Sequence, residues 1–199
     1  MANHPAAGHR VLYTIGHSNH TLEVFVDLLQ QHDIRQVVDV RSSPYSRHAT
    51  HFNKEALENH LSVAGLSYRF AGHALGGRPQ DPQYYDRQGY VLYDRIARAP
   101  TFQQELSRLT AQAVAARTAL LCGEEDPSEC HRRLLIGRVV IAEGFELLHL
   151  RGDGRAQSET ELIELENHQK TGGQLTMFDL DGDKPWRSTR SVSREHRPA

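Results

Sequence analysis

The chain has 199 residues, 24% of them charged, and a formal net charge of −2 at pH 7. This length allows one well-packed core with an appendage. The nearly balanced charge excludes a generally basic nucleic-acid-coating protein but leaves room for a local basic patch. No stretch is apolar for long enough to span a bilayer, and residues 1–10 lack the pattern of a signal peptide. We therefore expect a cytoplasmic protein with no membrane partner, in which both cysteines remain thiols.

Short apolar runs alternate with segments of helical periodicity along most of the chain. The runs that predict strands are residues 11–15, 37–40, 67–70, 119–122 and 145–150. The segments that predict helices are residues 22–32, 53–64, 89–98, 101–117, 130–143 and 158–168. This alternation is typical of an α/β fold, and we expect a Rossmann-like three-layer sandwich with a mainly parallel sheet.

The composition also divides the chain into regions. A flexible N-terminus at residues 1–10 precedes a single α/β domain at residues 11–169. From Lys170 the chain becomes polar and glycine-containing, and residues 179–199 have almost no apolar side chains. Because such a segment cannot bury a core, we expect a disordered C-terminal tail over residues 170–199.

Both cysteines lie in one stretch, residues 119–133, around which the predicted site is organised. The stretch starts as an apolar strand that ends at Cys122, breaks into an acidic turn, and returns to a helical pattern at Cys130. In an open α/β sheet, ligands bind outside the carboxyl ends of the strands, and the start of a helix favours an anion. We therefore expect Cys130, His131 and Arg132 to border a ligand site.

Other polar loops also follow predicted strands, and parallel strands bring such loops to one edge of the sheet. The candidate substrate-binding residues at this edge are Gly16, Ser18, Arg41, Ser42, Ser43, Ser46, His73, Gly76, Gly77, Cys122, His131 and Arg132. Guanidinium and hydroxyl groups together suit phosphate binding, although any one arginine is otherwise a surface ion-pair partner.

Three side chains in these loops are candidates for catalytic acid–base chemistry. Asp39 and Glu124 form a carboxylate pair if their loops meet, and His17 is a candidate proton shuttle. Alternatively, Asp39 accepts hydrogen bonds from neighbouring loop N–H groups, Glu124 belongs to a solvated turn, and His17 caps a strand end.

Cys130 is a candidate catalytic nucleophile, because a helix start beside His131 and Arg132 lowers the pKa of a thiol. The alternative is that Cys122 is a small buried apolar residue and Cys130 a packing residue of the first turn. A metal site built from Cys122, Cys130, His131 and a histidine such as His17 is a further alternative. Structural zinc normally uses closely spaced ligand pairs, which these cysteines do not form, so we expect no metal and no cofactor.

Four groups of residues together form a recognisable set of motifs. They are Thr14-Ile15-Gly16-His17-Ser18; Val38-Asp39-Val40-Arg41-Ser42 with Pro44 and Ser46; Leu75-Gly76-Gly77; and Leu121-Cys122-Gly123-Glu124 with Cys130-His131-Arg132. On these motifs, residues 11–150 resemble the family catalogued as domain of unknown function 488. The resemblance implies a Rossmann-like domain and supports the site positions, but it implies no particular reaction.

The pentapeptide Gln174-Leu175-Thr176-Met177-Phe178 resembles the docking motif by which bacterial DNA polymerases and repair proteins bind the replication sliding clamp. Met177 stands where the motif usually has its second leucine. In an extended peptide, Leu175, Met177 and Phe178 would fill apolar pockets while Gln174 makes directed hydrogen bonds. The alternatives are a chance match or a strand that packs back on the domain.

Three functional hypotheses follow. The first is a DNA-repair or DNA-processing enzyme, recruited by the sliding clamp and acting on a nucleotide or extruded base, with hydrolysis of a base–sugar bond preferred to phosphoester cleavage. The second is a thiol-dependent hydrolase or transferase, with Cys130 or Cys122 as the nucleophile, acting on a small phosphorylated or sulfur-containing substrate. The third is a non-catalytic nucleotide-binding adaptor tethered to the clamp.

Overall fold

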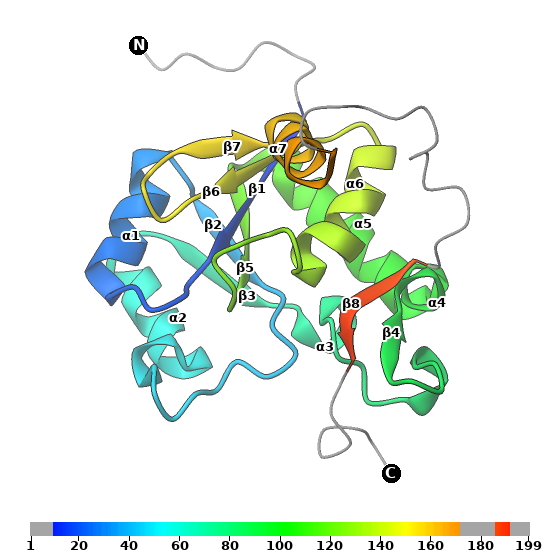
Figure 1. The fold of residues 1–199 in the computed structure, drawn as a ribbon. Helices are drawn as coiled ribbons and strands as arrows, with labels where there is room; N and C mark the ends of the chain where they lie inside the picture. The colour runs from blue at the N-terminus through cyan, green and yellow to red at the C-terminus, as the bar shows by residue number, and fades with distance from the viewer. Residues whose placement is uncertain (1–9, 172–185, 192–199) are drawn as a thin grey trace.

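The computed structural model describes residues 10–171 and 186–191 and contains a six-stranded sheet between two layers of helices (Figure 1). The strands of this sheet are β1 (Val11–Gly16), β2 (Gln36–Asp39), β3 (Ser67–Phe70), β5 (Thr118–Cys122), β6 (Glu146–Leu150) and β7 (Ala156–Ser158). Their spatial order is β3-β2-β5-β1-β6-β7, with β7 antiparallel to β6 and the other neighbours parallel. This arrangement confirms the mainly parallel α/β fold that the sequence predicted.

The central strands are covered on both faces, which is why their sequences are apolar almost throughout. Successive side chains point to opposite faces of the sheet and so belong to two separate cores. One core contains Ile15, Val37 and Leu121 with Phe25 and Leu29 of α1 (Leu22–Gln31). The other contains Leu12, Val38 and Leu120 with Phe102 and Leu106 of α5 (Pro100–Ala115).

The helices divide between the two faces of the sheet (Figure 1). On one face lie α1, which the side chain of Thr21 caps, and α2 (Lys54–Val63). On the other lie α5 and α6 (Arg138–Ala142). The remaining helical segments are α3 (Gly72–Leu75), α4 (Tyr93–Arg98), α7 (Glu159–Thr171), the 3-10 helices η1 (Thr50–Phe52) and η2 (Pro82–Tyr84), and the π-helix η3 (Arg132–Gly137).

Two of the helices expected from the sequence differ in the structure. Residues 89–98 do not form one helix, because the short strand β4 (Tyr90–Leu92) precedes α4. The helix expected over residues 130–143 is divided into η3 and α6. A π-type turn of this kind widens a helix and is often found at functional sites.

A strand near the C-terminus also returns to the domain. β8 (Arg187–Ser191) pairs antiparallel with β4. The preceding Trp186 anchors it, because the indole Nε1 donates a hydrogen bond to the carbonyl of Leu134 at 2.7 Å and the Arg138 guanidinium lies 4.7 Å from the ring centroid. Residues 186–191 therefore differ from the unstructured tail expected over residues 170–199, because one aromatic side chain ties them to the domain.

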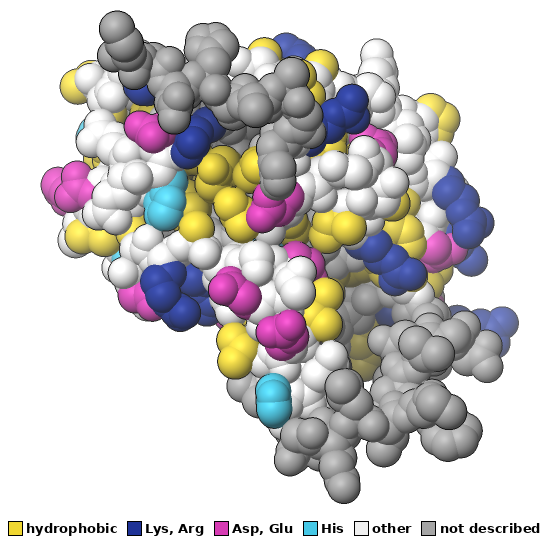
Figure 2. All heavy atoms as spheres, turned by 90° about the horizontal axis from the view of Figure 1, so that it is seen from above, with side chains coloured by type: hydrophobic (Ala, Val, Ile, Leu, Met, Phe, Trp, Pro, Cys, Tyr) yellow, Lys and Arg dark blue, Asp and Glu magenta, His cyan; other side chains and the backbone are white. Residues whose placement is uncertain are grey.

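The surface seen in Figure 2 carries acidic, basic and apolar side chains interspersed, without a continuous basic area among the described residues of that face. In the part of the chain that the structure describes, no helix is both long enough and apolar enough to cross a membrane.

Candidate functional site

The carboxyl ends of three neighbouring strands meet at one edge of the sheet. β5 lies between β2 and β1, and its last residue, Cys122, is in register with Gly16, while Leu121 is in register with Asp39. The loops that follow these strands therefore leave the sheet side by side. In a parallel α/β sheet this edge is where ligands bind.

These loops enclose an open cavity of about 640 Å³. Its lining includes most of the candidate residues from the sequence, namely His17, Arg41, Ser42, Ser43, Ser46, Gly77, Cys122, Glu124, Cys130 and His131. The lining also includes Arg78, Tyr93 and residues 188–191 of β8. The β8 residues had no local signal in the sequence, because nothing in a polar tail predicts a return to the domain except the single Trp186.

The other candidate residues lie outside this lining. His73 and Gly76 border a neighbouring cavity of about 390 Å³, which Ser42 and Arg78 share. Gly16, Ser18, Asp39 and Arg132 support the walls of the main cavity without lining it. The partner-binding candidates Gln174, Leu175, Met177 and Phe178 lie outside the described residues.

Two thiols, a carboxylate and an imidazole meet at the end of β5. The Cys122 thiol donates a hydrogen bond to Oε2 of Glu124 at 3.0 Å, and the Cys130 thiol lies 3.3 Å from the same oxygen. Nδ1 of His131 lies 3.8 Å from the Cys122 sulfur and 4.0 Å from the Cys130 sulfur. The two cysteines are only 4% and 2% exposed. We call these four residues the thiol cluster.

The imidazole of the thiol cluster has a defined orientation. Nε2 of His131 donates a hydrogen bond to the carbonyl oxygen of Val40 at 3.0 Å. Gly77 packs against the ring so closely that a Cβ there would lie 2.5 Å from Cγ of His131. With a proton on Nε2, Nδ1 faces the two sulfurs, carrying a lone pair when the ring is neutral and an N–H when it is protonated. Gly77 therefore positions this histidine as part of the cavity wall.

Close contact within the thiol cluster changes its proton affinities. Partial burial opposes ionisation of Glu124, but hydrogen bonds from the Cys122 thiol, from its own backbone N–H and from the Cys130 thiol outweigh it and lower the carboxyl pKa to about 2. The protonation of one thiol affects that of the other. Hydrogen bonding to Cys130 and burial raise the pKa of Cys122. The pKa of Cys130 is lowered because, against its burial, Cys122 and His131 stabilise the thiolate. One thiolate is therefore favoured over two.

Asp39 has a different role from the acid–base role considered for it. Both of its oxygens accept hydrogen bonds from Arg41, including one at 2.6 Å from Nη2, and Oδ2 also accepts the hydroxyl of Tyr68 at 2.7 Å. The residue is 0% exposed. Asp39 therefore holds Arg41 at the cavity wall and is not free to exchange protons with a ligand in the cavity.

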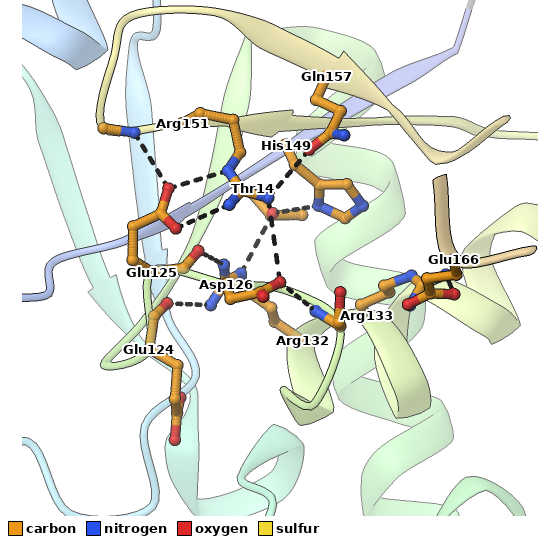
Figure 3. Close-up of polar contacts among 12 residues, drawn as sticks. Thr14, Glu124, Glu125, Asp126, Arg132, Arg133, His149, Arg151, Gln157 and Glu166 are labelled. Atoms are coloured by element: carbon orange, nitrogen blue, oxygen red, sulfur yellow. Dashed lines mark hydrogen bonds and ion pairs between the residues drawn. The ribbon is translucent and has the colours of Figure 1, made fainter. Parts of the chain in front are cut away.

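Arg132 also has a different role from the phosphate-binding role expected of it. Its guanidinium is fully buried and donates to the carbonyl oxygens of Glu124 and Glu125 and, at 3.3 Å, to Oγ1 of Thr14 (Figure 3). The side chain of Glu124 points away from this network (Figure 3). Glu125 in turn accepts two hydrogen bonds from Arg151, at 2.9 and 2.8 Å. Arg132 and Arg151 thus hold the acidic loop in place, with the side chain of Glu124 directed toward the sulfurs of Cys122 and Cys130.

His17 follows β1 and lies beside the start of the acidic loop, where its backbone N–H donates a hydrogen bond to the carbonyl of Cys122 at 3.0 Å. Its Nδ1 donates a hydrogen bond to the carbonyl of Ser18 at 3.0 Å, and its ring stacks on Phe52 with the centroids 4.5 Å apart. Burial lowers the pKa of His17, outweighing the hydrogen bond that raises it. Nε2 is the ring nitrogen left for the cavity.

The serine-rich loop after β2 supplies hydroxyl groups to the lining of the cavity. Oγ of Ser42 accepts the backbone N–H of Arg78 at 2.9 Å, and Oγ of Ser46 accepts the N–H groups of His48 and Ala49, each at 3.1 Å. As acceptors in these bonds, both hydroxyls keep their own proton for a ligand. Arg41 uses Nε and Nη2 for Asp39, so that Nη1 stays outside that ion pair.

A family model described as domain of unknown function DUF488 matches residues 21–139, more than half of the chain. The chain therefore belongs to this family. No curated protein and no solved structure gave a match.

Proposed function

We propose that this member of the DUF488 family is a hydrolase. Its substrate would be either a free nucleotide or a nucleotide whose base is extruded from DNA. The observation that carries the proposal is that one cavity combines an imidazole, a carboxylate and phosphate-binding groups. His17 and Glu124 lie near the ends of β1 and β5, and Ser42, Ser43 and Arg78 line the same cavity. A volume of about 640 Å³ suits a ligand of nucleotide size.

The phosphate of the nucleotide would lie against the serine-rich loop. Ser42 keeps a hydroxyl proton to donate, and Arg78, whose backbone N–H donates to Ser42, also lines the cavity. Guanidinium and hydroxyl donors are the usual ligands of a phosphate group. This orientation leaves the sugar and base for the end of the cavity near His17 and Glu124.

Hydrolysis of the base–sugar bond suits the charges at that end. As the bond to the base breaks, positive charge develops on the sugar, and a nearby carboxylate such as Glu124 stabilises it. A water molecule would attack the sugar carbon and pass a proton to Nε2 of His17, while the departing base takes a proton from solvent water. His17 then returns its proton to solvent, so that one water is added across the broken base–sugar bond. Phosphoester cleavage fits less well, because the carboxylate of Glu124 at this end of the cavity would repel a phosphoryl group.

The test is a screen of nucleosides, nucleotides and oligonucleotides with modified bases, in which release of the free base is measured. We expect release by the intact protein and a loss of at least about 100-fold in Glu124→Gln and in His17→Ala. Glu58→Gln, an exposed carboxylate on α2, is the matched control and should keep full activity. Strand cleavage or phosphate release without base release would replace this reaction by phosphoester hydrolysis, and binding without turnover would indicate the adaptor.

A second candidate function, a thiol-dependent hydrolase or transferase, is favoured by the contact between Cys130 and His131. A histidine beside a thiol is the arrangement that activates a cysteine nucleophile. The 2% exposure of Cys130 argues against it, since a nucleophile must reach its substrate. Trapping of a covalent adduct on Cys130 during turnover would support it, and unchanged turnover in Cys130→Ser would exclude it.

We also propose that the sliding clamp recruits the protein. The support is the sequence of residues 174–178 alone, since these residues lie outside the described structure. Binding of purified bacterial clamp should be lost when Gln174 and Phe178 are both changed to alanine. A matched double change of Ser191 and Ser193 to alanine should leave it intact, and equal binding by all three proteins would contradict the proposal.

A further inference from the structure

We propose that Cys122, Cys130 and His131 form a binding site for a zinc-type divalent metal ion, with Sγ, Sγ and Nδ1 as its ligand atoms. The three atoms all lie within 4.8 Å of one another. The two sulfur–nitrogen distances are 3.8 and 4.0 Å. Tetrahedral zinc with ordinary bond lengths places sulfur and nitrogen ligands about 3.6 Å apart. An ion can therefore enter with shifts of a few tenths of an ångström.

The types of ligand atom determine which metal fits. Thiolate and imidazole ligands favour zinc and other borderline or soft ions, whereas magnesium and calcium need oxygen ligands. Cys122 and Cys130 supply two sulfurs, and His131 supplies the nitrogen. This combination of two cysteines and one histidine points to zinc.

The orientation of His131 is the strongest support for the site. Histidines that bind metal through one ring nitrogen usually donate the other N–H to a carboxylate or a backbone carbonyl. His131 does so through Nε2, at 3.0 Å from the oxygen of Val40, and Gly77 packs against its ring. Nδ1 is thereby held toward both sulfurs before any ion binds.

The charges of the thiol cluster point the same way. Oε2 of Glu124 lies 3.0 and 3.3 Å from the two sulfurs, so three groups that become anions on losing a proton are in contact. Arg132, which follows His131, donates its side-chain hydrogen bonds to Thr14 and to loop carbonyls and not to the sulfurs. A divalent cation between the sulfurs would stabilise their ionised forms.

The fourth coordination position would be open. Three protein ligands with a vacant position beside a cavity are the pattern of catalytic zinc, whereas structural zinc has four protein ligands. Cys122, Glu124, Cys130 and His131 all line the main cavity, so this position would face a bound ligand, with Glu124 at its edge. The metal site stands on the geometry of the cluster and does not depend on the proposed reaction. If both hold, the ion would lower the pKa of a bound water and so favour hydrolysis.

The test is direct measurement of metal binding by the full-length protein, purified in the presence of a reductant. We expect one zinc ion per chain by elemental analysis. After chelation, cobalt(II) should bind with thiolate-to-cobalt charge-transfer absorption and the intense visible bands of a tetrahedral site. Cys122→Ser and His131→Asn should each weaken metal binding at least tenfold. His73→Asn, in the neighbouring cavity, is the matched control and should not.

A second measurement covers the case in which the variants fail to fold. In the unmodified protein, zinc should slow alkylation of both cysteines at least tenfold, and chelation should restore the faster rate. Protein that holds no zinc, gives no thiolate absorption with cobalt and shows no protection would overturn the metal site. Zinc binding without base release would instead overturn only the proposed reaction, and base release by the fully chelated protein would show that the reaction needs no metal.

Discussion

The carbonyl oxygen of Glu124 lies directly against Gly16 at the end of β1, so close that a Cβ there would be 1.8 Å away. The contact brings the acidic loop over the end of β1, and Arg132 and Arg151 hold the loop there. The position of Glu124 beside the two sulfurs is thus decided by the backbone of a different strand.

Gly16→Ala should displace the acidic loop. The added methyl group meets backbone atoms of Glu124 and Glu125, which cannot rotate away as a side chain can. We expect a loss of about 1–3 kcal/mol of unfolding free energy, measured by urea denaturation, and weaker zinc binding. Gly123→Ala is the matched control, because the nearest atom to its Cβ is 3.7 Å away, and it should change stability by less than about 0.5 kcal/mol. Equal effects of the two changes would contradict this account of the loop.

Arg132→Met should be among the most destabilising changes in the protein. It leaves the carbonyl oxygens of Glu124 and Glu125 without the donor that the guanidinium provides, while Thr14 keeps its hydrogen bond with Nδ1 of His149. Each unsatisfied buried polar group costs about 1–3 kcal/mol, so we expect a total loss of about 3 kcal/mol or more in urea denaturation. Arg155→Met removes a guanidinium that is 69% exposed and should change stability by less than about 1 kcal/mol. A loss below 1 kcal/mol in Arg132→Met would show that the loop does not depend on this residue.

Trp186→Ala should release β8 from the domain. It removes the hydrogen bond to Leu134 and the ring over which the Arg138 guanidinium lies. We expect amide hydrogen exchange to become faster in residues 187–191 and in β4, and limited proteolysis to cut the segment sooner. Thr189→Ala, an exposed change on the same strand, should leave the exchange rates unchanged. Unaltered exchange in Trp186→Ala would mean that β8 is held by its pairing with β4 alone.

The pair His149 and Glu159 should make stability depend on pH. Burial lowers the pKa of His149, against the raising effect of Glu159, with Arg132 and Arg133 also lowering it. Burial raises the pKa of Glu159, but the hydrogen bond from His149 and the charge of Arg133 lower it by more. Both groups then bind protons more weakly in the folded state, so stability is greatest above the unfolded pKa values and falls as the pH falls.

For His149 this loss should begin as the pH drops below about 6.5, and for Glu159 below about 4.5. Between pH 7.5 and 5.5, the melting temperature of His149→Gln should therefore decline less than that of the unmodified protein. His60→Gln, an exposed histidine of α2, should retain the full decline. Parallel declines in all three proteins would assign the pH dependence to other groups.

Much of the fold could be predicted from local patterns. The five predicted strands match β1, β2, β3, β5 and β6. For the central strands β1, β2 and β5, the signal was an apolar run ended by a polar loop, which indicates burial on both faces. The first and second predicted helices match α1 and α2 to within one or two residues. The helix predicted over residues 89–98 was wrong at its start, where pairing with the distant β8 makes residues 90–92 a strand.

The functional residues were less predictable, since the roles of individual side chains depend on their partners. Local patterns were enough to predict which polar groups follow the strands, because strand and loop signals are local. The hydrogen bonds of Asp39 with Arg41 and Tyr68 became evident in the folded structure. The tertiary structure also decided that Cys122 and Cys130 lie against one imidazole despite their wide spacing. Distances between residues far apart in sequence depend on the strand order and on how the buried arginines fasten the loops, and neither is encoded in any single segment.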